Sequence, residues 1–428
     1  MLKNVNNFLW IIATFLIFIS GIFLSFKIKF SQFNFKRMFG VLKENDNTDG
    51  ISTIQTLTLN LAAKIGVGSI TGIALAIYLG GPGTIFWMWI SALVASSNTF
   101  IESVLAVLYN EKDEGNIYKG GPYSYIEKGI GNKLLAKLYS FLILITFIGG
   151  FLTIQSNTIT VGLIDYFNVS PLIVGIVIAI LVGIMIIKGV KIIARVTNFL
   201  VPFMALLYFI LCFLIMIINI DKIPSIISEF FISAFSVKSV GIGTFSTFII
   251  GMQRGIFSHE AGIGTGAISA AVVDRKNFKS QGYIQTLGIY IDALIVGTLS
   301  AIVIMCCDYG NIHLVDANGI EIAKYAFSYH LGNFGNIMLL IIIILFAFSS
   351  IIAGYYYGES SIKYIKKNIN KSELLIFKLV ALILLVIGSI SSSRVLWNFV
   401  DIFIAILAII NIYSLWKLVN IISKNNYF

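Results

Sequence analysis

Charge is scarce in this sequence. Aspartate, glutamate, lysine and arginine make up only 12% of the 428 residues, whereas 58% are hydrophobic. A soluble domain carries about a quarter charged residues, and here apolar runs of about 18 residues or more recur almost without charge. The runs are continuous and do not alternate with polar residues, which favours helices over a membrane β-barrel. The composition excludes a soluble protein and predicts an all-α polytopic membrane protein.

Residues for catalysis and cross-linking are also scarce. The chain has three cysteines and three histidines, namely Cys212, Cys306, Cys307, His259, His313 and His330. Three cysteines are too few for a disulfide framework. The scattered histidines offer neither a metal cluster nor a base beside a nucleophile, and no Walker A motif is present. We therefore expect neither an enzyme nor a nucleotide-driven pump, and no cofactor.

Eleven apolar segments are long enough to cross a bilayer. They lie at residues 8–26, 53–80, 84–109, 134–160, 171–187, 196–219, 241–272, 281–307, 334–358, 373–390 and 395–420. No linker separates them, so residues 1–428 are expected to form a single transmembrane domain. The segment at 8–26 is long and lacks a small-residue cleavage site, so we interpret it as an anchor rather than a signal peptide.

Lysine and arginine are distributed unevenly over the loops. Alternate loops and the C-terminus hold 22 of them, whereas the opposite side holds five, Lys3, Lys222, Lys238, Lys324 and Arg394. The positive-inside rule then places the N-terminus outside and the C-terminus in the cytoplasm of a cell (inner) membrane. The net charge of +10 follows from this bias and suits anionic lipid headgroups, so no nucleic-acid partner is expected.

Two glycine clusters interrupt membrane-length segments, "KIGVGSITG" at 64–72 and "HEAGIGTGA" at 259–267. The second segment is the fifth predicted span after the first, and this odd offset inverts it relative to the first. Paired interruptions of this kind are typical of inverted-repeat transporters with two broken helices near the bilayer midplane. We therefore predict a 5+5 inverted repeat, residues 53–219 and 241–420, plus one extra N-terminal helix.

A broken helix needs a physical reason. Unwound backbone in hydrocarbon leaves N–H and C=O groups unpaired at a cost of several kcal/mol each, which is tolerable where a ligand binds. Free N–H groups suit a carboxylate, and free carbonyls suit a cation. The alternative is that the small residues serve close helix packing, as in G-x-x-x-G pairs. The inverted placement of the two clusters favours binding.

Several stretches resemble the alanine/glycine:cation symporter family. They are "NLAAKIGVGSITGIALAIYLGGPGTIFWMWISALV", "GGPYSYIEKGIG", "IQSNTI", "RGIFSHEAGIGTG", "FAFSSIIAGYYYGE" and "WNFVDIFIAILAIIN", in the family's order. The resemblance implies a leucine-transporter-like fold of ten core helices and the import of a small neutral amino acid with sodium. The chain departs from the family at the breaks, where Ser69 stands for a usual Asn, His259 for another Asn, and Lys64 for a small or hydroxylic residue.

The substrate is expected between the two breaks. The substrate-binding residues that we predict are Val67, Gly68, Ser69, Gln155, Asn157, Phe257, Ser258, Gly262 and Trp397. The first three would offer N–H groups to the carboxylate, and Phe257, Ser258 and Gly262 would offer carbonyls and an apolar wall. Trp397 is either an external lid or an interfacial aromatic. Gln155 and Asn157 either touch the ligand or join helices through hydrogen bonds.

A sodium site is implied by the same resemblance. Its ligands would be the carbonyls of Ala63 and Gly66 and the hydroxyls of Ser349 and Ser350. The alternative for the two serines is a hydrogen bond to a carbonyl of their own helix.

Charged residues inside the predicted spans are costly and usually functional or paired. Lys64 either takes part in coupling, as a replacement cation or a proton carrier, or pairs with an acid such as Asp401 or Glu359. Arg254 and Glu260 are expected to hold the second break and to act as gating partners. Further acids within the spans are Glu102 and Asp292.

Together these features predict a secondary active symporter that imports alanine or glycine with sodium by alternating access. One alternative is a proton-coupled or exchange transporter that uses Lys64. The other is an amino-acid sensor that binds its ligand without moving it.

Overall fold

The computed structural model describes residues 2–43, 51–112, 118–236, 243–307, 319–425 and 427. This described part is almost entirely helical, as expected. Its strands are β1 (Glu111–Lys112) and β2 (Tyr118–Lys119), which pair antiparallel with Glu111 opposite Lys119.

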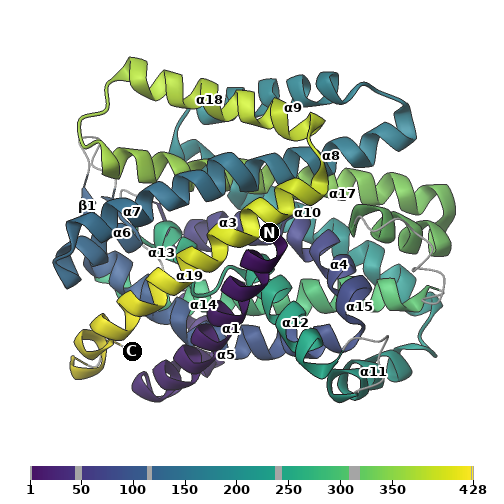
Figure 1. The fold of residues 1–428 in the computed structure, drawn as a ribbon, viewed down its shortest axis with the longest axis horizontal. Helices are drawn as coiled ribbons and strands as arrows, with labels where there is room; N and C mark the ends of the chain where they lie inside the picture. The colour runs from purple at the N-terminus through teal and green to yellow at the C-terminus, as the bar shows by residue number, and fades with distance from the viewer. Residues whose placement is uncertain are drawn as a thin grey trace.

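The helices follow one another with short connections (Figure 1). The first half of the chain contains α1 (Leu2–Lys27), η1 (Ser31–Phe33), α2 (Phe35–Val41), α3 (Thr53–Lys64), η2 (Val67–Ser69), α4 (Thr71–Gly80), α5 (Gly83–Leu108), α6 (Pro122–Tyr125), η3 (Ile126–Ile130), α7 (Lys133–Leu144), η4 (Ile145–Phe151), α8 (Leu152–Phe167), α9 (Pro171–Ile186) and α10 (Val190–Ile218). The second half contains α11 (Ile223–Phe235), α12 (Thr244–His259), α13 (Thr265–Ala270), η6 (Arg275–Asn277), α14 (Phe278–Tyr290), η7 (Ile291–Val296), α15 (Gly297–Cys306), α17 (Gly319–Ile365), α18 (Lys371–Ile390) and α19 (Ser393–Lys424).

Eight helical stretches of the described residues are long and apolar enough to cross a membrane. They coincide with eight of the eleven predicted spans. The predicted span at 171–187 is α9, whose 16 residues make it shorter than the others. The two remaining spans, 53–80 and 241–272, are interrupted. A polytopic helical protein is thus confirmed, and the inverted relation between the halves stays a prediction.

The first interruption separates α3 from α4. A capping box between Ser52 and Gln55 starts α3, and the helix ends at Lys64. Gly66 is extended (φ −131°, ψ −153°), and a single 3₁₀ turn, η2, leads into α4. Glycine lets the chain leave the helix here without a side chain in the way.

The second interruption separates α12 from α13. Three residues between these helices have left-handed backbone conformations: Glu260 (φ 53°), Gly262 (φ 82°) and Gly264 (φ 86°). Two of the three are glycines, for which positive φ carries no steric cost. The sequence therefore breaks both helices with glycine, as predicted, and without proline.

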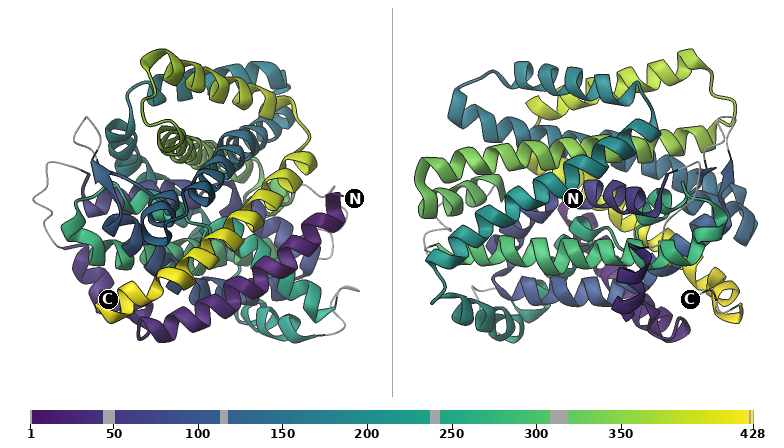
Figure 2. Two further views of the ribbon diagram at one scale, coloured as in Figure 1. Left: turned by 60° about the vertical axis from the view of Figure 1, so that its left-hand side comes forward. Right: turned by 180° about the vertical axis from the view of Figure 1, so that it is seen from behind.

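The broken helices lie inside the bundle. α12 packs on α5 and α4, and α3 packs on α10, α14 and α17. α9 and α18 pair at one edge, and α1 and α19 run side by side along another face in both views (Figures 1 and 2). Every residue from Ile65 to Gly72 and from Gly255 to Val272 is buried.

The extra N-terminal helix is bound into the bundle by polar contacts. The Trp10 indole donates to the carbonyl of Asp401 (3.1 Å), and the Ser20 hydroxyl donates to Asn98 (2.7 Å). Trp416 of α19 donates in turn to the Ser20 hydroxyl (2.9 Å). These hydrogen bonds fasten α1 to α5 and α19.

Candidate functional site

The first break and the end of α12, which leads into the second break, meet at the carboxylate of Asp292. This residue lies in the π-helical segment η7 and accepts hydrogen bonds from the Ser69 hydroxyl (2.5 Å) and the Ser258 hydroxyl (2.8 Å). The two hydroxyls are 3.3 Å apart, and Ser300 donates to the Ser69 carbonyl (2.6 Å). Asp292 was not among the predicted site residues. Its position inside an apolar span could have indicated a role in the site, because an acid in such a span usually faces the interior of a helical bundle.

Close packing explains the glycines of the first break. A Cβ at Gly66 would collide with the Ser350 hydroxyl, and one at Gly68 would lie 3.1 Å from the Phe257 ring. Gln155 reaches the same place, because its side-chain oxygen accepts from the Val67 N–H at 3.4 Å. The structure thus brings together Val67, Gly68, Ser69, Gln155, Phe257 and Ser258.

Two other predicted substrate residues make different contacts. Asn157 donates to the carbonyls of Gly388 (3.1 Å) and Ser391 (2.7 Å) and accepts from Ser393 (2.5 Å). It therefore joins α8 to the link between α18 and α19. The Gly262 carbonyl accepts from the amide of Asn411 (3.0 Å).

An aromatic and charged layer separates the breaks from an open cavity. Trp397 lies against Phe257 with ring centroids 4.5 Å apart, and the Arg254 guanidinium lies 5.1 Å from the Trp397 ring. Arg254 forms a buried ion pair with Asp401, which also accepts from Gln253 at 2.9 Å. Beyond this layer is a cavity of about 690 Å³ lined by α1, α12 and the start of α19. Trp397 thus lies where a lid would lie.

The second break is held by His259. Its Nδ1 accepts from the Ala261 N–H (3.1 Å), which leaves Nε2–H to donate to the Ser91 hydroxyl (2.9 Å). Arg254 was expected to hold this segment and instead ties α12 to α19 through Asp401. The Glu260 carboxylate is buried, and neither of its oxygens has a hydrogen-bond partner among the described residues. The role of Glu260 as a tie or gating partner stays a prediction.

Hydroxyl and carbonyl oxygens gather where α3 ends against α17. Ser350 donates to the carbonyls of Ala62 (2.8 Å) and Ala63 (3.3 Å), and Ser349 lies 3.3 Å from the Ala62 carbonyl. Ser349 also bonds its own helix at Phe346 (2.8 Å), which was the alternative for both serines. Such neutral oxygens suit Na⁺ as cargo. The described residues contain no group of three His, Cys, Asp or Glu that could hold a metal.

Lys64 is buried at the end of α3. Its Nζ has no hydrogen-bond partner within the described ranges. The carboxylates of Glu260, Glu102 and Asp292 are near enough to attract its positive charge electrostatically. The predicted pairing with Asp401 or Glu359 is wrong, because Asp401 binds Arg254 and Glu359 binds Lys363 at 2.5 Å. Since Arg254 and Lys363 occupy these two acids, neither pairs with the Lys64 ammonium.

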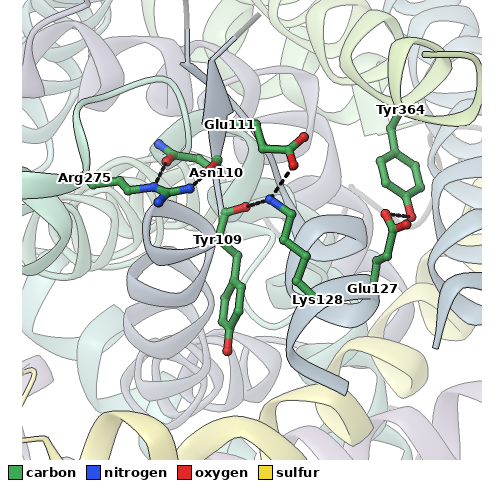
Figure 3. A network of polar contacts seen from close by, with 7 residues as sticks. All are labelled: Tyr109, Asn110, Glu111, Glu127, Lys128, Arg275 and Tyr364. Atoms are coloured by element: carbon green, nitrogen blue, oxygen red, sulfur yellow. Dashed lines mark hydrogen bonds and ion pairs between the residues drawn. The ribbon is translucent and has the colours of Figure 1, made fainter. Parts of the chain in front are cut away.

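A polar network surrounds the hairpin that follows α5 (Figure 3). Lys128 donates to the Tyr109 carbonyl (3.0 Å) and pairs with Glu111 (2.8 Å), and this hydrogen bond lowers the pKa of Glu111. Arg275 binds Asn110 (3.1 Å), whose amide donates to the Ala271 carbonyl (2.9 Å) after α13. The hairpin after α5 is thereby fastened to the chain that leaves the second break.

Comparison with known proteins places these features in one family. The family model for the sodium:alanine symporter family matches residues 1–427. The chain belongs to the sodium:alanine symporter family. It is therefore a multi-pass membrane transporter and not an enzyme.

Relatives agree with the family. The chain is 35% identical over 422 residues to the amino-acid carrier protein AlsT of Bacillus subtilis, covering 98% of this chain and 89% of that one. It is 30% identical over 437 residues to the sodium/alanine symporter AgcS of Methanococcus maripaludis, covering 99% and 95%. A variant of the Eremococcus coleocola manganese transporter has a similar fold, with a TM-score of 0.58 at 15% identity over 87% of this chain and 80% of that one.

Proposed function

We propose that this family member is a secondary active symporter that imports a small neutral amino acid, alanine or glycine, together with sodium. The observation that carries the proposal is the fully buried junction at which Asp292 joins Ser69 of the first break to Ser258 at the end of α12. Such a junction offers hydroxyls and a carboxylate to a zwitterion. A Cβ at Gly68 would lie 3.1 Å from the Phe257 ring, and packing this close favours a substrate with a small side chain.

The layers on either side of the junction suit alternating access. The Arg254–Asp401 pair and the Trp397–Phe257 contact cover one side, and the network around Lys128 and Arg275 covers the other. From the lysine and arginine distribution we place the first layer outside and the second in the cytoplasm. Opening one layer while the other stays closed would carry substrate and cation across.

The coupling ion has two candidates. The oxygens of Ala62, Ala63, Ser349 and Ser350 support sodium, as does the family's name. The unpartnered Lys64 supports a proton, because a buried amine with three carboxylates around it can gain and lose one proton per cycle.

Uptake of radiolabelled glycine, L-alanine and D-alanine into proteoliposomes tests the proposal. An inward Na⁺ gradient, an inward H⁺ gradient and no gradient are compared for the wild type and for Lys64→Thr. We expect Na⁺-driven accumulation, unchanged by the substitution if Lys64 has no part in coupling. Accumulation driven by H⁺ alone and lost in Lys64→Thr would establish the proton. Absence of uptake of all three under every gradient would refute the substrate class.

A further inference from the structure

Polar residues form a stripe along the buried faces of α3 and α14. On α3 they are Thr56, Asn60 and Lys64, each one helical turn after the last, and on α14 they are Gln281 and Gln285. All five side chains are buried, in helices that pack against one another. Residues four apart share a helix face, so the stripe is continuous.

The α14 stripe leads to the substrate junction. Gly288 and Asp292 lie three and seven residues beyond Gln285 on the same helix face, and Asp292 binds Ser69 of the first break and Ser258 at the end of α12. The side-chain nitrogen of Asn60 lies 3.3 Å from where a Cβ at Gly288 would stand, so the two stripes face each other. At the other end, Thr56 donates to Gln281 at 2.9 Å. Thr56 is eight residues before Lys64, which corresponds to about 12 Å of helix.

The stripe is only half satisfied by protein. Gln281 accepts from Thr56 and from Gln285 (3.0 Å), yet the Gln281 amide nitrogen and the Gln285 oxygen have no hydrogen-bond partner in the described part of the chain. Neither side-chain atom of Asn60 has one, nor does Lys64 Nζ. Burying a polar atom without a hydrogen-bond partner destabilises the fold by more than one hydrogen bond stabilises it. In protein interiors such atoms are commonly satisfied by bound water. A stripe that only joined two helices would pair its members.

We propose that a file of water molecules between α3 and α14, held by Thr56, Asn60, Gln281 and Gln285, carries protons between Lys64 and the cytoplasm. This inference rests on the proton-coupled alternative within the proposed function, in which Lys64 and not sodium provides the coupling. The Lys64 ammonium gives one proton to the nearest water and becomes a neutral amine, and the file releases one proton at the inner end. The amine takes up its next proton from the outer side.

The groups that face Lys64 fit this role. Glu102 approaches from α5, Glu260 and His259 from the second break, and Asp292 from η7. The negative charges of the carboxylates stabilise the protonated form of Lys64, and none of them is hydrogen-bonded to the ammonium. Intramembrane acids and bases beside water-filled cavities commonly form proton relays.

Water in the file is tested first, independently of transport. Radiolytic hydroxyl-radical labelling, read by mass spectrometry, oxidises buried side chains that adjoin bound water. Leu57 and Leu61 adjoin Gly288 and the stripe, and both are nearly buried. We expect them to be labelled several-fold faster than Leu142, which is buried to a similar degree on α7, a helix that packs on α6, α17 and η4. Equal labelling of the three leucines would overturn the file.

Proton conduction is tested in proteoliposomes that contain a pH-sensitive dye. Alanine counterflow and alanine-driven acidification of the lumen are measured on the same vesicles. We expect Asn60→Leu and Gln285→Leu to keep counterflow and lose acidification. Thr286→Val, which removes a hydroxyl bonded to its own helix at Gly282 (2.8 Å), is the matched control and keeps both.

The outcomes separate the two proposals. Absence of counterflow in the wild type refutes alanine as the substrate, while the labelling still decides on the water. Counterflow without acidification in the wild type, or acidification that survives both leucine substitutions, overturns the proton path and leaves the substrate proposal intact.

Discussion

Gly66→Ala is a direct probe of the oxygen cluster proposed for sodium. The backbone of Gly66 is extended, so alanine adopts it without strain, and the effect is one of packing alone. The added methyl group would overlap the Ser350 hydroxyl and lie 3.3 Å from the Ser350 Cβ and 3.4 Å from the Gln155 amide nitrogen. Overpacking of this kind costs about 1–3 kcal/mol.

A second substitution separates packing from ion binding. Ser350→Ala removes the colliding oxygen and its hydrogen bonds to the Ala62 and Ala63 carbonyls, at about 0.5–1.5 kcal/mol. In the double variant the overlap is gone, so it should recover at least about 1 kcal/mol relative to the sum of the two single effects. Thermal unfolding of the purified proteins in detergent gives the order of stability.

The Na⁺ concentration that uptake requires should not follow the thermal stability of the variants. Gly66→Ala and Ser350→Ala each distort or remove a ligand, and a loss of about 1–3 kcal/mol raises the half-saturating Na⁺ concentration about 5- to 150-fold. The double variant should keep that defect even though its stability recovers. Strictly additive destabilisation would refute the overlap, and an unchanged Na⁺ dependence in Ser350→Ala would refute the site.

Three further perturbations test other contacts. Asp292→Ala leaves two buried serine hydroxyls without their acceptor, at about 1–3 kcal/mol, so we expect alanine uptake to fall by at least tenfold while the protein still elutes as a single species in size-exclusion chromatography. Arg254→Ala leaves Asp401 buried and unpaired, which costs about 3–5 kcal/mol; thermal unfolding should show recovery when Asp401→Ala is added, and no recovery would contradict the pair. The hydrogen bond from Lys128 holds the pKa of Glu111 below its usual 4.5, so its stabilisation is present above that pH and is lost as pH falls through the lowered value. The unfolding temperatures of wild type and Lys128→Gln should therefore differ at neutral pH and converge in acid.

The breaks could be predicted because their cause is local. Glycine runs beside charged residues inside apolar segments have few explanations, and both segments unwind where the sequence indicated. The predicted substrate residues Val67, Ser69, Phe257 and Ser258 came together for the same reason, since each lies at or beside a break.

Pairing between distant helices could not be predicted. The partner of Lys64 was sought among acids at suitable depth, yet Asp401 lies against Arg254 and Glu359 one turn from Lys363. The depth of a residue in the membrane follows from its position in the sequence. The neighbouring helix that its side chain faces depends on how its own helix is rotated about its axis. For Asn157 the sequence left ligand contact and helix-to-helix hydrogen bonding open, and the structure shows hydrogen bonds of the second kind.

The π-helical segment η7 sets the register of the site. Asp292 and Ser300 are eight residues apart, and both bond to Ser69. On a regular α-helix, positions eight apart point about 80° away from each other, whereas one extra residue in a π turn reduces the difference to about 20°. The alignment of the Asp292 and Ser300 side chains therefore depends on the number of residues between them as well as on their chemistry. Deleting one codon within 293–296 would remove the extra residue and leave the two side chains about 20° apart on a regular α-helix, whereas inserting one codon there would turn Ser300 and everything after it by about 100°. An insertion is therefore the change that this segment should tolerate least.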